Sequence, residues 1–317
     1  MNAITFGEVL WDVIENEEHI GGAPFNLASH LAQMGADAAF VSAVGRDERG
    51  RKAVEKAHSY GLHTEFISER SEAPTGVVYV TVDEKGNPSY DIQEGAAWDD
   101  IRLTEEQERR LSETSWDVLT FGTLAQRTPE NRTTLARVIE ASGAREVFYD
   151  VNLRLHYYDE KILRQSLEYT TILKLNDEEV KEVGRLVLGD TPEGEEFCRR
   201  MEKEWDLKVV IITRGGRGAS IYSRGEYFHV PVIDVSVRDT VGAGDSFSAA
   251  FLYGFFVAES LHIAANLAAL VSSYVASSNG AVPVYDEPVR KAIERVRREA
   301  SDESPEMGEE TAGEEEE

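Results

Sequence analysis

The sequence predicts an α/β fold: a central, mostly parallel sheet flanked by helices, with a small β lid. Short β-branched runs alternate with longer segments of helical periodicity, which is typical of parallel strands covered by helices. One segment breaks this alternation with two consecutive strands. The chain has 317 residues, 41% of them hydrophobic, which is enough to bury a full core.

The alternation can be followed along the chain. We expect strands at residues 3–6, 38–44, 118–121, 147–150, 171–175 and 209–213. Helical patterns lie between them, for example over residues 47–60, 129–141 and 177–186. We find no fixed-period repeat and no long linker, so residues 1–300 are predicted to form a single domain.

The break in the alternation reads as an antiparallel hairpin. Residues 76–82 alternate as a strand does, residues 83–87 are a polar turn, and residues 88–93 form the returning strand. A hairpin inserted between βα units suggests a flap. An edge hairpin without a function fits the same pattern.

The charge excludes several classes of partner. The net charge of −26 argues against nucleic acid and anionic lipid, because both require a basic face. Residues 301–317 carry 9 acidic and no basic side chains, which indicates a disordered, solvating tail. Any phosphate must therefore be held locally.

No membrane partner is expected. The longest apolar run, residues 247–258, is shorter than the roughly 20 residues that span a bilayer. The first residues show neither a basic leader nor an apolar signal core, so we expect a cytoplasmic protein.

The segment Asp-Thr-Val-Gly-Ala-Gly-Asp at residues 239–245 runs directly into an apolar helix. Small residues at a helix N-terminus let the backbone approach an anion, and the unpaired N–H groups and helix dipole favour negative charge there. A carboxylate at its end, Asp245, could take a proton from a hydroxyl that attacks phosphorus. Taken alone, the segment could equally be a tight turn with a capping Asp.

Other polar segments follow strands. Thr213 to Ala219 is glycine-rich and lies where open α/β sheets bind ligands. Asn176 to Glu179 opens a helix, and its local interpretation is a capping box. Near the start, Asp12, Gly22 and Asn26 could hydrogen-bond a sugar or simply cap a turn and a helix. The chain has neither the Gly-Lys pair of a P-loop nor a complete Rossmann fingerprint.

Taken in order, residues 21–26, 150–154, 176–179, 213–218 and 239–245 resemble the PfkB carbohydrate kinases. The resemblance covers about residues 1–290, and the 239–245 segment is highly specific for that family. Gly-Gly-Ala-Pro-x-Asn at residues 21–26 looks more like fructokinases than ribokinases. The resemblance implies a ribokinase-like fold, in which residues of about 8–20 and 64–97 form a lid over the sugar.

The resemblance also implies roles for single residues. Asp245 matches the catalytic base, and the matching anion hole is Gly242, Ala243 and Gly244. The implied sugar contacts are Asp12, Gly22, Asn26 and Arg154, with Tyr79 and Gln93 as lid candidates. The implied ATP site consists of Asn176, Thr213, Gly215, Gly218 and Asn266.

The implied cofactors are ATP and Mg²⁺. Glu179 matches the residue that organises magnesium, through water. Asp239 matches the position that holds a monovalent cation, K⁺, in many relatives, but residues 281–284 lack the usual hydroxyl, so K⁺ dependence stays open.

The resemblance favours ATP-dependent phosphorylation of a sugar primary hydroxyl, with fructose first. Val151 stands where fructokinases commonly have Pro, and Gln93 stands where a basic residue is often found. The alternatives are a 2-keto-3-deoxygluconate kinase, with Arg154 on the substrate carboxylate, a nucleoside kinase, and a non-catalytic sugar- or nucleotide-binding regulator. A homodimer joined through lids is expected, with Val78 and Val80 on the pairing face unless that face covers the sugar.

Overall fold

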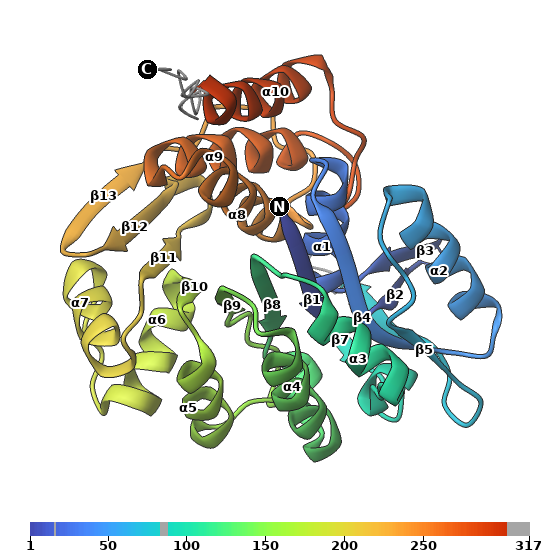
Figure 1. The fold of residues 1–317 in the computed structure, drawn as a ribbon. Coiled ribbons are helices and arrows are strands. Elements are labelled where there is room, and N and C mark those ends of the chain that lie inside the picture. The colour runs from blue at the N-terminus through green and yellow to red at the C-terminus, as the bar shows by residue number, and fades with distance from the viewer. Residues whose placement is uncertain (16, 83–87, 303–317) are drawn as a thin grey trace, which may run out of the picture.

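The main sheet is built from the β-branched runs of the sequence. The computed structural model describes residues 1–15, 17–82 and 88–302. Its nine-stranded sheet has the order β13-β12-β11-β10-β9-β8-β1-β4-β5, parallel from β11 to β5 and antiparallel at β12 and β13 (Figure 1). The strands are β1 Asn2–Phe6, β4 Asp37–Gly45, β5 Ile67–Arg70, β8 Val118–Gly122, β9 Glu146–Asp150, β10 Ile172–Asn176, β11 Val209–Thr213, β12 Ala219–Ser223 and β13 Glu226–Val230.

Helices cover both faces of this sheet, and each face has its own apolar cluster. Alternation within the strands divides the two clusters: Phe40 belongs to one, and its neighbours Ala39 and Val41 to the other. One face carries α1 Ala23–Gln33, α2 Glu48–Tyr60, α8 Ala243–Ala258, α9 Leu261–Ala276 and α10 Glu287–Asp302 (Figure 1). The other carries α3 Glu105–Glu113, α4 Pro129–Ser142, α5 Glu160–Tyr169, α6 Asp177–Val183 and α7 Gly194–Trp205.

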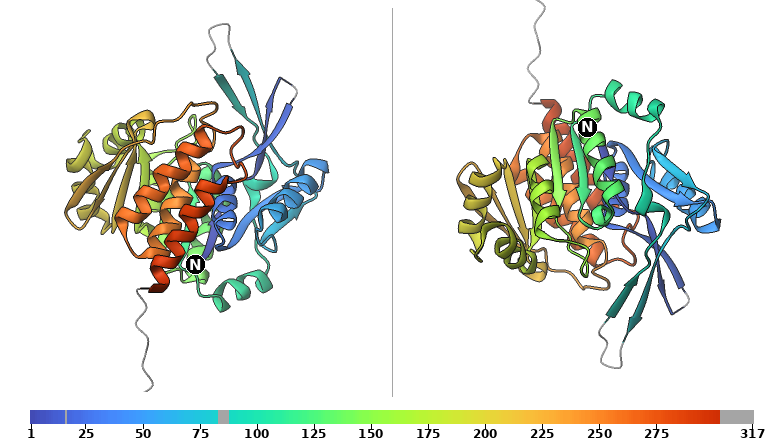
Figure 2. Two further views of the ribbon diagram at one scale, coloured as in Figure 1. Left: turned by 90° about the horizontal axis from the view of Figure 1, so that it is seen from above. Right: turned by 90° about the horizontal axis from the view of Figure 1, so that it is seen from below.

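A second, four-stranded sheet projects from the body (Figure 2). It has the order β3-β2-β6-β7, from β2 Leu10–Ile14, β3 Glu17–Gly21, β6 Gly76–Val82 and β7 Pro88–Ile92. A small apolar cluster joins it to the body through Leu10, Val78, Ile92, Ala96, Trp98 and Leu124. We call this sheet the lid.

The predicted elements are confirmed with one difference. The six expected strands all form, and the hairpin forms β6 and β7, with its turn outside the described residues. Residues 64–75 were expected within the lid, but β5 pairs with β4 and extends the main sheet instead. The tail lies outside the described residues from residue 303 onward.

The parallel strands β1, β9, β10 and β11 all end at the same edge of the sheet. The N-termini of α1 and α8 meet at this edge, because Asn26 in α1 bonds to Asp245 in α8. Lid strand β3 ends at Gly21, just before α1, which brings the base of the lid to the same place. In the part of the chain that the structure describes, no helix is long and apolar enough to cross a bilayer.

Candidate functional site

Asp245 stands in the first turn of α8 and is half-buried. Its Oδ2 accepts a hydrogen bond of 2.8 Å from Nδ2 of Asn26. The pKa of Asp245 is raised to about 6, chiefly by burial and also by Asp150, while Asn26, Lys174 and Arg154 act to lower it. A carboxylate with a pKa near neutral can both accept a proton and release it at physiological pH.

The glycine turn before α8 requires glycine at its first position. Gly242 has φ 76°, and a Cβ there would lie 2.4 Å from the carbonyl oxygen of Ala281. Asp239 shapes the turn from the other side, since its Oδ1 accepts the N–H of Val241 at 3.0 Å. The turn therefore brings the backbone of 242–244 to the helix N-terminus, where the first N–H groups lack helical partners.

A buried histidine supports this turn from behind. Nε2 of His30 donates to the carbonyl of Ala281 at 2.9 Å, and the Tyr285 hydroxyl donates to Nδ1 of His30 at 2.6 Å. Burial lowers the pKa of His30 to about 4, so the ring is neutral and keeps this donor–acceptor arrangement. Helix α1 thus contacts both Asp245, through Asn26, and the loop that packs against Gly242.

A buried ion pair lies directly beneath the turn. Nζ of Lys174 donates to both carboxylate oxygens of Asp150, at 3.1 and 2.8 Å, and Ser248 donates to the same carboxylate at 3.2 Å. A Cβ on Gly244 would lie 3.5 Å from Nζ, so the ammonium is next to the turn. Both partners influence the ionisation of Asp245, with opposite signs.

The sugar-side residues that the resemblance implies surround the base of the lid. Burial raises the pKa of Asp12, on β2, to about 6. Gly22 has φ 108°, and a Cβ there would lie 2.5 Å from the carbonyl oxygen of Glu8. Arg154 is exposed, and its positive charge lowers the pKa of Asp12, of Glu8 and of Asp245. These groups therefore share one electrostatic environment.

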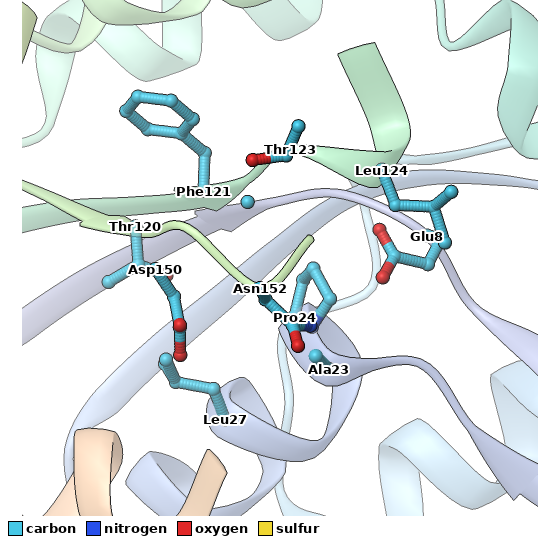
Figure 3. Close-up of a pocket in the computed structure, with 11 residues that line it drawn as sticks. Glu8, Ala23, Pro24, Leu27, Thr120, Phe121, Thr123, Leu124, Asp150 and Asn152 are labelled. Atoms are coloured by element: carbon cyan, nitrogen blue, oxygen red, sulfur yellow. The ribbon is translucent and has the colours of Figure 1, made fainter. Parts of the chain in front are cut away.

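Glu8 follows β1 and is buried, with 3% of its surface exposed. Burial raises the pKa of Glu8 to about 7, and Arg154 and Arg127 lower it. The carboxylate lies beside Pro24 and Asn152 at a small cavity (Figure 3). Asn152 has φ 40°, a strained conformation of the kind that gathers at functional sites.

Asn176 and Glu179 form the capping box that their spacing predicts. The Asn176 side chain accepts the N–H groups of residues 178 and 179, and Oε2 of Glu179 accepts the N–H of Asn176 at 2.8 Å. Oε1 of Glu179 also accepts the N–H of Leu153 at 2.8 Å, which ties α6 to the 150–154 loop. Burial raises the pKa of Glu179.

The residues around Glu179 fit the way in which proteins usually hold magnesium. Among residues 1–15, 17–82 and 88–302, no three or more His, Cys, Asp or Glu side chains gather to hold a metal ion. Mg²⁺ usually keeps several waters and binds through one or two carboxylates plus substrate phosphates, so it needs no protein cage. Glu179 fits that mode, since each carboxylate oxygen keeps a lone pair beside its one backbone donor.

The implied ATP residues lie further along the same edge. Thr213 ends β11, and Gly215 and Gly218 shape the turn after it with φ 51° and 79°. A Cβ on Gly218 would lie 2.2 Å from the carbonyl of Val230, so only glycine fits there. Asn266 is exposed on α9.

The two lid candidates do not join the site. Tyr79 alternates with Val78 and Val80, which pack in the lid cluster, so Tyr79 is on the other face and is 44% exposed. The Gln93 side chain donates to Asp91 at 2.8 Å instead of reaching inward.

Sequence reasoning gave no role to Glu8, Arg127 or Lys174. Arg127 ends a short helix after β8 and pairs with Asp99 through Nε at 2.6 Å and Nη2 at 2.7 Å. Its guanidinium stacks on Trp98 at 4.1 Å and also donates to the Gln93 carbonyl. The only sequence signal for Lys174 was a lysine inside an otherwise apolar strand.

Comparisons with known proteins identify the family of the chain. The model of the pfkB family carbohydrate kinases matches residues 2–287. The fructokinase of Escherichia coli is 25% identical over 239 residues, covering 74% of this chain and 76% of that protein. The 5-dehydro-2-deoxygluconokinase of Listeria monocytogenes is 24% identical over 305 residues, covering 90% of each.

A third relative has a solved structure. The uncharacterized sugar kinase PH1459 of Pyrococcus horikoshii is 28% identical over 298 residues, covering 85% of this chain and 89% of that protein. Its crystal structure in complex with ATP matches with a TM-score of 0.78 at 25% identity, covering 93% of this chain and 99% of that chain. The family model spans nearly the whole chain, and the fold agrees throughout; the protein belongs to the pfkB family of carbohydrate kinases and is a sugar kinase of ribokinase-like fold.

Proposed function

We propose that this kinase transfers the γ-phosphoryl group of ATP to a primary hydroxyl of a neutral sugar, with fructose as the first candidate. The observation that carries this proposal is Asp245, held by Asn26 beside the glycine turn at the start of α8. A base at that position can accept the hydroxyl proton while the turn faces the phosphoryl oxygens.

The ionisation of Asp245 suits this role. Burial raises its pKa to about 6, so at pH 7 most molecules carry the carboxylate, and the base remains strong enough to accept a proton. Asn26 fixes the orientation of Oδ2, and this leaves Oδ1 for the attacking hydroxyl. Deprotonation of the hydroxyl at Oδ1 is thus the step that this chain itself performs.

The charges around the base of the lid favour a neutral sugar. Glu8, Asp12 and Asp245 are three carboxyl groups whose pKa values burial raises to about 7, 6 and 6. Raised values mean that a further negative charge here is costly, because these groups already resist ionisation. A substrate carboxylate would add such a charge.

The second candidate is an acidic sugar such as 2-keto-3-deoxygluconate. Arg154 favours it, because the one hydrogen bond described for its guanidinium is to the adjacent Leu153 carbonyl at 3.2 Å. A free fork of this kind can bind a carboxylate in bidentate fashion. Arg154 acts on three carboxyl groups whose pKa values burial raises, and this makes the acidic sugar the weaker proposal.

For ATP we propose the turn after β11, with Thr213, Gly215 and Gly218, together with Asn176. Glu179 would hold Mg²⁺ through water, and the ion would neutralise the phosphate charge when bound.

We also propose a homodimer that is joined through the lids. Val78 and Val80 already pack inward in each chain, so two lids would pair through their strand edges or through the face that carries Tyr79.

The test is ADP release from ATP and Mg²⁺ with D-fructose, 2-keto-3-deoxygluconate, ribose and adenosine in parallel. Fructose is expected to give the largest kcat/KM. A larger kcat/KM with 2-keto-3-deoxygluconate would replace the first candidate by the second. ATP binding without ADP from any acceptor would instead favour a non-catalytic binding protein.

A further inference from the structure

Three buried polar atoms without hydrogen-bond partners, from Glu8, Asn26 and Arg127, surround the base of the lid. Among the described residues, five buried side-chain atoms have no hydrogen-bond partner: Glu8 Oε2, Asn26 Oδ1, Arg127 Nη1, Glu146 Oε2 and Ser273 Oγ. Asn26 bonds to Asp245, and Glu8 feels the charges of both Asp245 and Arg127. Unpaired buried polar groups are costly, so a cluster of them indicates groups that a ligand completes.

Rigid neighbours hold two of these atoms in place. Asp99 binds two of the Arg127 guanidinium nitrogens, and the guanidinium carbon lies over the rings of Trp98 and Tyr157, at 4.1 and 4.8 Å from their centres. Only 5% of the Arg127 side chain is exposed. Its remaining nitrogen, Nη1, is a fixed donor with no acceptor among the residues that the structure describes. Glu8 is fixed by burial after β1.

The space at Glu8 has the size of one oxygen atom. The cavity measures about 10 Å³ and is lined by Glu8, Pro24, Leu124 and Asn152 among others (Figure 3). A cavity of this volume accepts one water molecule or one hydroxyl group at most. It is too small for a sugar ring, but it fits a single hydroxyl that projects from a ring bound next to it.

We propose that Glu8 binds one hydroxyl group of the sugar, and that Arg127 and Asn26 contribute the next donor and acceptor of the same substrate. This inference rests on the proposed sugar kinase activity. Glu8 is then a specificity-determining residue on the side of the sugar that is not phosphorylated. A carboxyl group accepts from or donates to a hydroxyl, so this contact selects a polyol rather than a deoxygenated or carboxylate-bearing group.

The experiment compares Glu8→Gln with the matched variant Glu146→Gln. Glu146 is a buried acid with an unpartnered Oε2, as Glu8 is, but it stands at the opposite, amino-terminal end of its strand. KM for fructose and for ATP is measured for both variants and for the unmodified protein. We expect Glu8→Gln to raise KM for fructose about tenfold, the effect of weakening one buried charged hydrogen bond. Glu8→Gln should change KM for ATP by less than about twofold, because ATP does not contact Glu8 in this proposal. Glu146→Gln should change neither KM for fructose nor KM for ATP by more than about twofold, because Glu146 is remote from the sugar.

A series of monodeoxyfructoses identifies the hydroxyl. With the unmodified protein, one analogue should show a KM about tenfold higher than fructose, since the buried carboxyl loses its partner. In Glu8→Gln that particular penalty should largely disappear. The measurements with the unmodified protein need no variant, so the inference remains testable even if Glu8→Gln does not fold.

The possible results distinguish a wrong role for Glu8 from a wrong function for the protein. If the unmodified protein phosphorylates fructose and Glu8→Gln behaves as Glu146→Gln does, Glu8 holds only a buried water and the inference is wrong. If the unmodified protein penalises no single deoxy position, the inference is equally overturned. A protein that turns over no sugar contradicts the proposed function, and the inference falls with it.

Discussion

Replacing Lys174 by methionine should move the acid limb of the kcat/KM profile to higher pH. Asp245 must be ionised to act as a base, so activity falls as pH drops through its pKa, about 6 in this structure. The Lys174 ammonium lowers that pKa, and the paired Asp150 carboxylate raises it. Loss of the ammonium leaves an uncompensated carboxylate near the base.

The size of the change follows from Coulomb's law. A unit charge at roughly 6 to 8 Å, with an effective dielectric constant of about 20, changes an ionisation free energy by about 2 to 3 kcal/mol. Solvent at the open edge weakens this, so we expect the limb of Lys174→Met to rise by about one pH unit or more. Asp150→Asn should move the limb in the opposite direction, to lower pH.

The assay is the pH dependence of kcat/KM for the sugar, from pH 4.5 to 9, for the two single variants and the double variant. Breaking a buried pair costs about 3 to 5 kcal/mol of stability, so each protein is first checked for cooperative thermal unfolding. The double variant lacks both charges, and its limb should lie near that of the unmodified protein. Folded single variants whose limbs move in the same direction, or do not move, would refute the electrostatic reasoning.

Three further changes test other parts of the structure. Gly242→Ala should lower kcat by about 10² or more, because the new Cβ would lie 2.4 Å from the Ala281 carbonyl and distort the turn; kinetics at saturating ATP measure this. Gly254→Ala should destabilise the fold by about 1 to 3 kcal/mol, since its Cβ would lie 2.7 Å from Cα of Ala264, and denaturant unfolding reports it; unchanged stability would mean that the α8–α9 contact is looser than described. Glu179→Gln should raise the Mg²⁺ concentration needed for half-maximal ADP release, and an unchanged magnesium titration would remove Glu179 from that role.

The sequence was a good guide where local pattern determines structure. The buried strands of the main sheet alternate with amphipathic helices, and this alternation predicts which segments along the chain are strands and which are helices. The capping box of Asn176 and Glu179 also follows from local spacing. β5 was missed because this strand, Ile67–Arg70, has only four residues and three of them are polar. It forms a strand through its pairing with β4, which the local sequence does not show.

The site was predictable in its motifs but not in its long-range partners. Lys174 pairs with Asp150 because β9 and β10 place them opposite each other in register, which no local pattern reveals. Arg127 meets Asp99 across 28 positions of sequence. Tyr79 was a lid candidate for the substrate; alternation shows that Val78 and Val80 share a face of the hairpin, but not which face turns inward.

The most direct test of the central claim is ADP release by Asp245→Ala beside the unmodified protein, with ATP, Mg²⁺ and the best acceptor. The variant should still bind ATP, and its turnover should fall by about 10² to 10⁴, the loss expected for a missing general base. An Asp245→Ala protein that is folded and turns over at a near-normal rate would contradict the account.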